Sequence, residues 1–253
     1  MLITILGSGT SQGVPVIGCK CSVCQSSDIK DVRLRSAVLI TIEDKNYVID
    51  TGPDFRQQML NNKVDSLEAI LYTHEHKDHI SGMDDVRAYN FLQKKPMELF
   101  CSHDVEQALR REYYYVFAED SYPGIPKVNL NRVVNEPFEL GGFSVNPILV
   151  YHYKMPVFGY RIGGFVYVTD AKTISSEERD KMRGAKVLVI NALRRQEHIS
   201  HLNLTEALDL IEDIQPEMTY LTHISHLFDT HKNIEAELPD NVRVCYDGLT
   251  FEV

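Results

Sequence analysis

The chain has 253 residues, of which 43% are hydrophobic and 25% are charged, a composition typical of a globular protein and not of a disordered one. Its formal net charge of -10 and pI near 5.5 exclude a global cationic field of the kind that attracts duplex DNA or folded RNA. The N-terminal apolar run, Leu2 to Leu6, is too short for a signal peptide or a membrane span, so we expect a cytoplasmic protein without membrane association.

In chain order, short runs rich in β-formers predict strands at residues 2–6, 37–42, 47–50 and 69–73, followed by helices at 84–93 and 104–115. Further strands are predicted at 143–150, 165–169, 187–190 and 218–222, with helices at 176–182 and 204–214. Strands and helices thus alternate through both halves, which favours an α/β layer architecture with functional loops at the carboxyl ends of strands. No linker divides the chain, so we expect one domain over residues 1–253.

The segment 113–135, rich in Tyr, Pro and Asn, is the least regular stretch, and it is interpreted as a lid or a substrate-facing insertion. No motif is recognised between residues 91 and 135, so the role of this region is not predicted. His103 and His231 stand near the starts of expected helices and are interpreted as surface residues. Cys101 and Cys245 lie in apolar stretches and are interpreted as small buried hydrophobes.

The strongest pattern is Thr-His-Glu-His-Lys-Asp-His at residues 73–79, directly after an apolar strand. In an extended strand exit, His74 and His76 point the same way because the side-chain period is two, whereas Asp78 and His79 enter the next turn and can face a second ion. One loop can therefore serve two metals. Imidazole and carboxylate ligands suit Zn, Mn or Fe without choosing sharply among them.

A site for two ions needs more ligands than this loop supplies. Three candidates directly follow predicted strands, namely His152, Asp170 and His223. Each taken singly has a second interpretation as an ordinary polar residue at a strand end. Together with the loop they make a complete ligand set.

In this chain order, the ligands resemble those of the metallo-β-lactamase superfamily, in which a His-x-His-x-Asp-His loop is followed by a lone His, a lone Asp and a late His. The resemblance implies a four-layer αββα sandwich with two mixed sheets. It implies that one metal is held by His74, His76 and His152, that the other is held by Asp78, His79 and His223, and that Asp170 bridges both. Asp50, in the Ile-Asp-Thr-Gly turn at residues 49–52, would orient the metal-binding loop without being a ligand.

A cluster of cysteines indicates which group within this superfamily the chain resembles. Cys19, Cys21 and Cys24 form a Cys-x-Cys-x-x-Cys pattern, which in a chain without a secretion signal is typical of a metal site before a disulfide. Together with the Thr-His-x-x-His sequence at residues 222–226, this pattern resembles the phosphoribosyl 1,2-cyclic phosphate phosphodiesterases of the carbon-phosphorus lyase pathway. That resemblance implies a separate structural zinc on the three thiolates and His226, a closed tetrahedral site without an open position for water.

The phosphodiesterase resemblance implies a metal-dependent hydrolase that cleaves a small, cyclic phosphodiester with a hydroxide activated by two Mn²⁺ or Zn²⁺ ions. Asp78 is then part of the catalytic centre, and His201, which precedes the helix at 204–214, would contact the scissile phosphate and, if protonated, act as general acid. Arg56 and Arg87 lie in further matching segments and are possible substrate contacts, although exposed arginines are usually only solvated.

Other functions share the same metal loop and stay open. They are an RNA 3′-end endonuclease of the tRNase Z kind, a thioester hydrolase, and a non-catalytic metal-binding accessory protein. The acidic composition and the lack of a basic Gly-rich arm argue against the endonuclease, and the complete ligand set argues against the accessory protein. We expect a small phosphodiester as the partner, no stable nucleic acid complex, and a possible homodimer.

Overall fold

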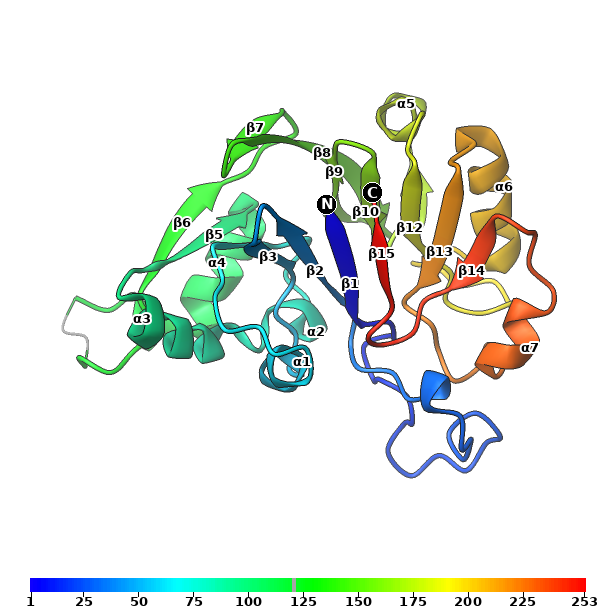
Figure 1. Cartoon of the computed structure of the whole chain (residues 1–253), viewed down its shortest axis with the longest axis horizontal. Coiled ribbons are helices and arrows are strands. Elements are labelled where there is room, and N and C mark those ends of the chain that lie inside the picture. The colour runs from blue at the N-terminus through cyan, green and yellow to red at the C-terminus, as the bar shows by residue number, and fades with distance from the viewer. Residues whose placement is uncertain (120–121) are drawn as a thin grey trace.

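The computed structural model describes residues 1–119 and 122–253. Two β-sheets stack face to face, and helices cover the outer face of each sheet, as Figure 1 shows. This is the four-layer αββα arrangement with two mixed sheets that the family resemblance implied. The two ends of the chain lie side by side, with the amino group of Met1 donating to the carbonyl of Val253 at 3.2 Å.

The first sheet has the strand order β15-β1-β2-β3-β4-β5-β6. Its strands are β1 (Leu2–Gly7), β2 (Ala37–Ile42), β3 (Lys45–Ile49), β4 (Ala69–Leu71), β5 (Met97–Cys101), β6 (Val128–Arg132) and β15 (Thr250–Glu252). The helices of this half are η1 (Ile29–Asp31), α1 (Phe55–Asn61), α2 (Lys77–Ile80), η2 (Met83–Val86), α3 (Arg87–Gln93), α4 (His103–Glu112) and η3 (Tyr114–Val116). Strands β3 to β6 run parallel to one another.

The second sheet has the order β11-β8-β9-β10-β12-β13-β14, and β7 pairs with β8. Its strands are β7 (Phe138–Leu140), β8 (Phe143–His152), β9 (Met155–Ile162), β10 (Phe165–Val168), β11 (Thr173–Ile174), β12 (Val187–Asn191), β13 (Met218–Thr222) and β14 (Val242–Val244). The helices of this half are α5 (Ser176–Met182), α6 (Leu204–Ile214) and α7 (His231–Glu235). Strands β10, β12, β13 and β14 are parallel.

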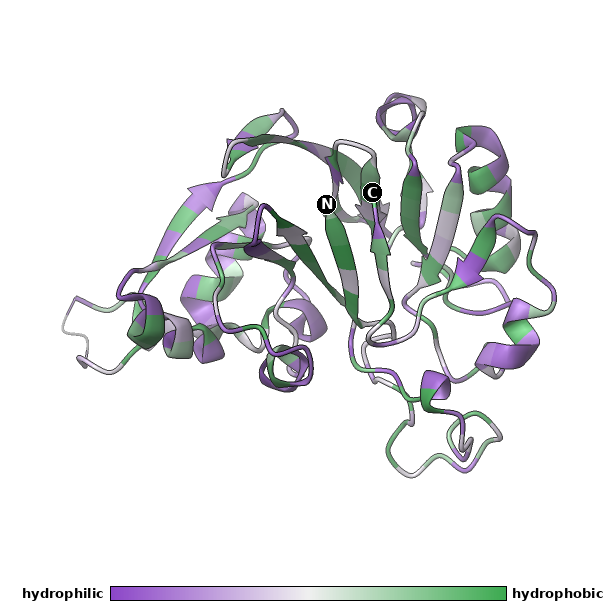
Figure 2. Ribbon diagram, viewed as in Figure 1, coloured by the Kyte–Doolittle hydropathy of each residue, from purple (hydrophilic) through white to green (hydrophobic). Residues whose placement is uncertain are grey.

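Three apolar clusters fill the three spaces between the four layers. Strand β10 shows how, because its side chains alternate: Phe165 and Tyr167 pack between the sheets, whereas Val166 and Val168 pack beneath the helices of the second half. The third cluster lies between the first sheet and its helices and includes Val48 and Ile70. Figure 2 shows the result, with apolar strands inside and polar helix surfaces outside.

Two helices begin and end at the predicted residues because their boundary signals are strong. Ser175 caps α5 by accepting from the amide of Glu178, and Asn203 forms a capping box with Glu206 at the start of α6. The helix predicted over 84–93 is instead a 3₁₀ turn, η2, followed by α3.

His231 corrects one prediction. It begins α7, as expected, but its side chain is buried and its amide donates to Asp31 Oδ1 at 2.6 Å. Cys101 and Cys245 are buried, as predicted. In the part of the chain that the structure describes, no helix has both the length and the apolar character needed to cross a membrane.

Candidate metal centre

The carboxyl ends of the parallel strands meet at one edge of the sandwich, and they carry the predicted ligands there. Asp50 follows β3, His74 follows β4 by three residues, Asp170 follows β10 and His223 follows β13. His152 ends β8. The fold thus brings together residues that are far apart in sequence, for the reason that functional loops gather at this end of parallel strands.

Three of these strand exits have left-handed backbone: Asp50 with φ 66°, Asp170 with φ 57° and His223 with φ 58°. Such a conformation costs a non-glycine residue about 1–3 kcal/mol and persists only where the surroundings enforce it. The turn directs each side chain from the end of its strand into the cluster. Concentration of strain at these residues is typical of a functional site.

The carboxylate of Asp170 lies at the middle of the cluster. Its Oδ2 is 3.4 Å from Nε2 of His79, and its Oδ1 is 3.3 Å from Nε2 of His223. Asp78 Oδ2 lies 3.1 Å from the same His79 nitrogen. Ligand atoms of His74 and His152, which belong to the other predicted set, lie within 4.8 Å of the Asp170 carboxylate. Asp170 therefore adjoins both predicted ligand sets, as the predicted bridging role requires.

The remaining predicted ligands surround Asp170. The His74 ring lies 4.7 Å from the His76 ring between centroids, and the His76 ring lies 5.1 Å from that of His152. His76 is exposed whereas His74 is buried, so the cluster opens to solvent on the His76 side. The structure thus brings all seven predicted metal ligands into one cluster, namely His74, His76, Asp78, His79, His152, Asp170 and His223.

Four of the imidazoles have their Nδ1 atom engaged by an acceptor. His79 Nδ1 donates to Asp50 Oδ2 at 2.7 Å and His152 Nδ1 donates to the carbonyl of Ser200 at 2.8 Å. In the neutral ring, the Nδ1 proton fixes the tautomer, so that the lone pair is on Nε2. This is the protein environment that histidine ligands of metals usually have.

The other two imidazoles, His223 and His74, have a hydroxyl group beside Nδ1. Each hydroxyl already donates its own proton to another group, so it accepts the proton of the imidazole Nδ1. Ser36 Oγ donates to the carbonyl of Gly9 and therefore accepts from His223 Nδ1 at 3.1 Å. Thr73 Oγ1 donates to Asp50 Oδ2 and therefore accepts from His74 Nδ1 at 3.0 Å. Asp50 thus orients two ligands, one directly and one through Thr73.

The donor set fits divalent metal ions. Nε2 of His74 is buried without a hydrogen-bond partner among the described residues, a costly state that a bound cation would relieve. Burial lowers the pKa of His74 and of His223, so both imidazoles are neutral and can ligate at pH 7. The ligands are nitrogen and oxygen atoms, which suit zinc or manganese.

His79 differs from the other ligands in its protonation. Burial alone would lower its pKa, but Asp78, Asp50 and Asp170 outweigh burial and hold the pKa well above the ordinary value. A metal ion must therefore displace a proton from His79. We expect Mn²⁺ uptake to release on the order of one proton per chain and its affinity to fall as pH falls from 8 to 6. Calorimetric titration in two buffers of different ionisation enthalpy measures this, and uptake without proton release would contradict it.

His201 lies beside the cluster. Its ring centroid is 4.4 Å from that of His152, and its Nδ1 is 3.7 Å from Asp170 Oδ1. Burial lowers the pKa of His201 to about 3, so the imidazole is neutral at pH 7. The general-acid role predicted for a protonated His201 therefore requires an anion bound nearby, which would raise the pKa.

The two predicted arginine contacts lie apart from the cluster. Both are exposed; Arg56 is on α1 at the rim of a cavity of about 620 Å³ lined mainly by apolar side chains, and Arg87 begins α3 with an ion pair of 3.8 Å to Asp84. Among the described residues, neither forms a hydrogen bond or ion pair with the histidine cluster. Their roles as substrate contacts stay predictions.

The cysteine cluster and His226 also come together. Cys19 Sγ lies 3.3 Å and Cys21 Sγ 3.5 Å from His226 Nδ1. Tetrahedral zinc with ordinary bond lengths would separate sulfur and nitrogen by about 3.6 Å. The backbone amide of Cys24 and the ring of His226 lower the pKa of Cys21 to about 6, which favours the thiolate that a metal needs. The four side chains therefore fit a closed metal site.

Several supporting residues were not predicted. Ser36 and Ser200 hold histidine ligands, and Asn191 pins the chain after Asp170 through two hydrogen bonds with the backbone of Ala171. Nothing in the local sequence distinguishes these residues from ordinary serines and asparagines. Their positions follow only from the tertiary fold.

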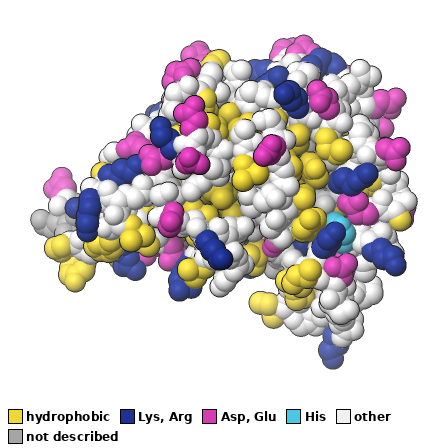
Figure 3. Space-filling model, in the orientation of Figure 1, with side chains coloured by type: hydrophobic (Ala, Val, Ile, Leu, Met, Phe, Trp, Pro, Cys, Tyr) yellow, Lys and Arg dark blue, Asp and Glu magenta, His cyan; other side chains and the backbone are white. Residues whose placement is uncertain are grey.

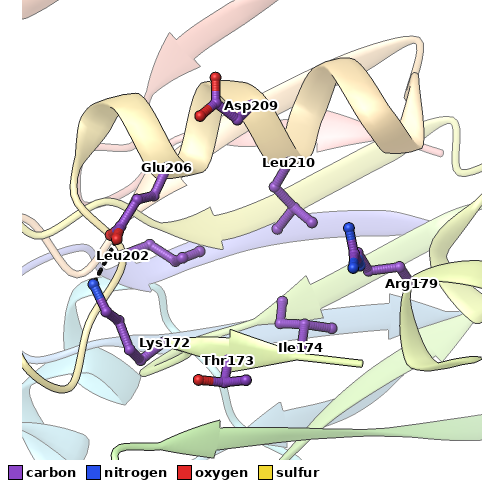
Figure 4. Close-up of a pocket in the computed structure, with 8 residues that line it drawn as sticks. All are labelled: Lys172, Thr173, Ile174, Arg179, Leu202, Glu206, Asp209 and Leu210. Atoms are coloured by element: carbon purple, nitrogen blue, oxygen red, sulfur yellow. Dashed lines mark hydrogen bonds and ion pairs between the residues drawn. The ribbon is translucent and has the colours of Figure 1, made fainter. Parts of the chain in front are cut away.

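A pocket of about 350 Å³ lies between β11 and α6 (Figure 4). Lys172 and Glu206 pair across it at 2.6 Å, and Ile174 and Leu210 line its apolar part. The lysine charge is satisfied by its partner. None of the predicted metal ligands lines this pocket, so we assign the chemistry to the histidine cluster.

Comparison with known proteins agrees with this geometry. A family model for the β-lactamase superfamily domain matches residues 45–224. A crystal structure described as a new diphosphatase from the PhnP family is 37% identical, with a TM-score of 0.93 over 100% of this chain and 97% of that one. Zn²⁺-bound PqqB from Methylobacterium extorquens shares the fold, with a TM-score of 0.83, 20% identity and 100% of both chains covered.

A further relative is named octanoyltransferase, from Porphyromonas gingivalis, and is 40% identical over 252 residues. The match covers 98% of this chain but 51% of that protein, so this chain spans about half the length of the relative. The full-length likeness to the PhnP-family structure is therefore the more informative one for this domain. The chain belongs to the β-lactamase superfamily and, within it, to the PhnP family, and it has the metallo-β-lactamase fold.

Proposed function

We propose that the protein hydrolyses a small phosphorylated substrate at a phosphorus atom that carries two ester or anhydride substituents, either a cyclic phosphodiester or a diphosphate. The observation that carries this proposal is the position of Asp170, whose carboxylate adjoins His79 and His223 of one predicted ligand set and His74 and His152 of the other. Full-length likeness to a PhnP-family diphosphatase supports a phosphoryl substrate.

In this proposal His74, His76 and His152 hold one divalent ion, and Asp78, His79 and His223 hold the other. Two divalent ions, when bound, would lower the pKa of a water toward about 7 and offset negative charge on the phosphoryl group. Two carboxylates, Asp78 and Asp170, against two divalent ions leave a net positive charge, which favours an anionic substrate. Mn²⁺ and Zn²⁺ both suit the imidazole and carboxylate ligands.

His201 would act on the leaving group. A substrate phosphate bound beside it would raise its pKa from the low value that burial produces, because a nearby anion favours the imidazolium. The imidazole would then hold a proton at a nitrogen facing the leaving oxygen and donate it as the P–O bond breaks. His201→Ala should lower kcat by about 10²–10³-fold with the metals retained, which stopped-flow and metal analysis would show together.

The segment 19–24, here called the cysteine arm, would hold one structural zinc together with His226. The zinc ligands would be Cys19, Cys21, Cys24 and His226. Backbone pairing between Ile224 and Gly9 places the loop that carries His223 and His226 beside the chain that leads into the cysteine arm. Cys21→Ser should lower the zinc content by about one ion per chain and the melting temperature by about 5–10 °C. Ser22→Ala, at an exposed position on the same arm, is the matched control and should change neither quantity.

The proposal is tested by hydrolysis of bis(p-nitrophenyl) phosphate, a cyclic phosphate and a dinucleotide diphosphate by protein loaded with Mn²⁺ or Zn²⁺. We expect metal-dependent turnover that Asp78→Ala abolishes. An octanoyl thioester belongs in the same panel because of the relative named octanoyltransferase. If only the thioester were hydrolysed, the protein would be an acyl hydrolase and the phosphoryl proposal would fail. If metal-loaded protein hydrolysed none of these substrates, a non-catalytic accessory role would be favoured.

A nucleic acid substrate is disfavoured by charge. Lys and Arg side chains are interspersed with Asp and Glu on the face shown in Figure 3, and they form no continuous cationic surface there. With a net charge of -10, binding of an RNA through its phosphates would be weak at physiological salt. The tRNase Z alternative therefore predicts RNA cleavage at low salt, which the same preparation can test. A homodimer stays a prediction.

A further inference from the structure

A second histidine lies just outside the metal cluster, in the loop before α6. The His198 ring centroid is 5.0 Å from that of His201, which is in turn 4.4 Å from that of His152. The three rings form a row that leads from the metal ligands outward. His198 is half-buried, so it stands where the cluster meets solvent.

The tautomer of His198 is fixed by its neighbours. Its Nδ1 lies 3.3 Å from the backbone nitrogen of Ser200 and 3.2 Å from the Ser200 hydroxyl. A backbone N–H can only donate, so Nδ1 is the acceptor and the proton of the neutral ring is on Nε2. Within the described residues this Nε2–H has no hydrogen-bond partner. It is an oriented donor beside the cluster without an assigned acceptor.

Arg194 supplies a positive charge next to this donor. Its Nη2 donates to the carbonyl of Glu197 at 3.1 Å, which holds the guanidinium against the backbone immediately before His198. Its Nε is buried without a partner, and the described residues place no carboxylate within 4 Å of the guanidinium. An arginine with most of its donors unused, four residues before His198 in the same loop, is suited to bind phosphate oxygens.

Neighbouring cations do not share this property. Arg195 is paired with Glu237 at 2.7 Å, and Lys172 is paired with Glu206 in the pocket of Figure 4. Their charges are largely offset by these partners. Arg194 and His198 therefore form a distinct pair of free donors beside the metal centre.

We propose that His198 and Arg194 form an anion subsite that holds a second phosphate of the substrate, the one that is not attacked. The inference rests on the proposed function and narrows it, because it favours a diphosphate over a diester with a single phosphate. A neutral N–H donor and a guanidinium together complement two phosphate oxygens. The metal cluster would then take the reacting phosphate and this subsite the other.

Calorimetric binding tests the subsite without turnover. The probes are the α,β-methylene analogue of ADP, which has two phosphorus groups, and AMP, which has one, each titrated into Mn²⁺-loaded protein. His198→Asn keeps an oxygen that can accept from Ser200 in the place of Nδ1, but it lacks the N–H at the position of Nε2. Arg194→Gln removes the positive charge of the guanidinium. Arg195→Gln is the control for loss of a neighbouring arginine.

We expect His198→Asn and Arg194→Gln each to raise the Kd of the methylene analogue by about 10-fold or more, because a charge-assisted hydrogen bond is lost. The Kd of AMP should change less than about 3-fold in the same variants, and Arg195→Gln should leave both Kd values near wild type. Equal weakening of both probes, or of neither, would overturn the subsite, as would a wild type that binds AMP as tightly as the analogue.

The binding test of the subsite and the turnover test of the proposed function can fail independently. Wild-type protein that binds the analogue through His198 and Arg194, but hydrolyses no phosphorylated substrate, would support the subsite and overturn the hydrolysis. Turnover of bis(p-nitrophenyl) phosphate with unchanged analogue binding in both variants would support the hydrolysis and overturn the subsite.

Discussion

Asp170→Asn should abolish metal-dependent turnover, with a loss of at least about 10³-fold in kcat/KM and loss of bound ions after dialysis. The carboxylate is buried, and its two oxygens face the Nε2 atoms of His79 and His223. An asparagine has one oxygen, and its amide would direct N–H donors at a site built for cations. Because both predicted ligand sets adjoin this residue, both ions should be affected.

Metal content by mass spectrometry and kcat/KM for bis(p-nitrophenyl) phosphate measure the two effects. Asp240→Asn makes the same chemical change at an exposed position and should behave as wild type. Circular dichroism shows whether Asp170→Asn is folded. A folded Asp170→Asn variant that keeps its metals and loses less than 10-fold in kcat/KM would remove Asp170 from the centre.

Asp50→Asn should weaken metal binding by about 10–100-fold, the usual cost of removing a carboxylate that orients a histidine ligand. Asp50 accepts from His79 Nδ1 and from both donors of Thr73. An asparagine can accept through one oxygen only, so His79 or Thr73 loses its partner and the ligand loop loosens. The ligands themselves remain.

Asp50→Asn should therefore differ from Asp170→Asn in one respect: saturating Mn²⁺ should restore most of its turnover. A titration of activity against free Mn²⁺ separates the two cases, with Asp240→Asn again as the control. Activity that excess metal does not restore would mean that Asp50 contributes to the reaction beyond holding its ligands. Activity with wild-type metal affinity would mean that the Asp50 hydrogen bonds are dispensable.

The cluster of candidate ligands was predictable from sequence because the segment 74–79 concentrates four side chains of metal-ligand type, and because His152, Asp170 and His223 lie at or just after strand ends. The helices at 176–182 and 204–214 were predictable because a capping residue marks each start, and Pro216 follows the second closely. In contrast, β9 went unpredicted because it contains Pro156 and Gly159, which weaken a strand pattern. The pairing of β15 with β1 joins the two ends of the chain and leaves no local signal.

The residues that hydrogen-bond to the candidate ligands could not be predicted either, because their contacts also join distant parts of the chain. Ser36 contacts His223 across 187 positions of the chain, and a serine before a strand carries no mark of that role. Burial of His201 depends on packing of the loop before α6 against the cluster, so its low pKa follows from the fold alone. Local sequence specifies which residues can ligate, whereas tertiary structure decides which atoms are free to do so.

The most direct test of the central claim follows the oxygen of water into the product. The Mn²⁺-loaded protein is allowed to hydrolyse bis(p-nitrophenyl) phosphate in H₂¹⁸O, and the ¹⁸O content of both products is determined by mass spectrometry. If the histidine cluster directs water to phosphorus, one ¹⁸O appears in p-nitrophenyl phosphate, none appears in p-nitrophenol, and Asp170→Asn forms neither product. Unlabelled p-nitrophenyl phosphate, or labelled product formed equally by Asp170→Asn, would contradict the claim that this cluster is a phosphoryl hydrolase centre.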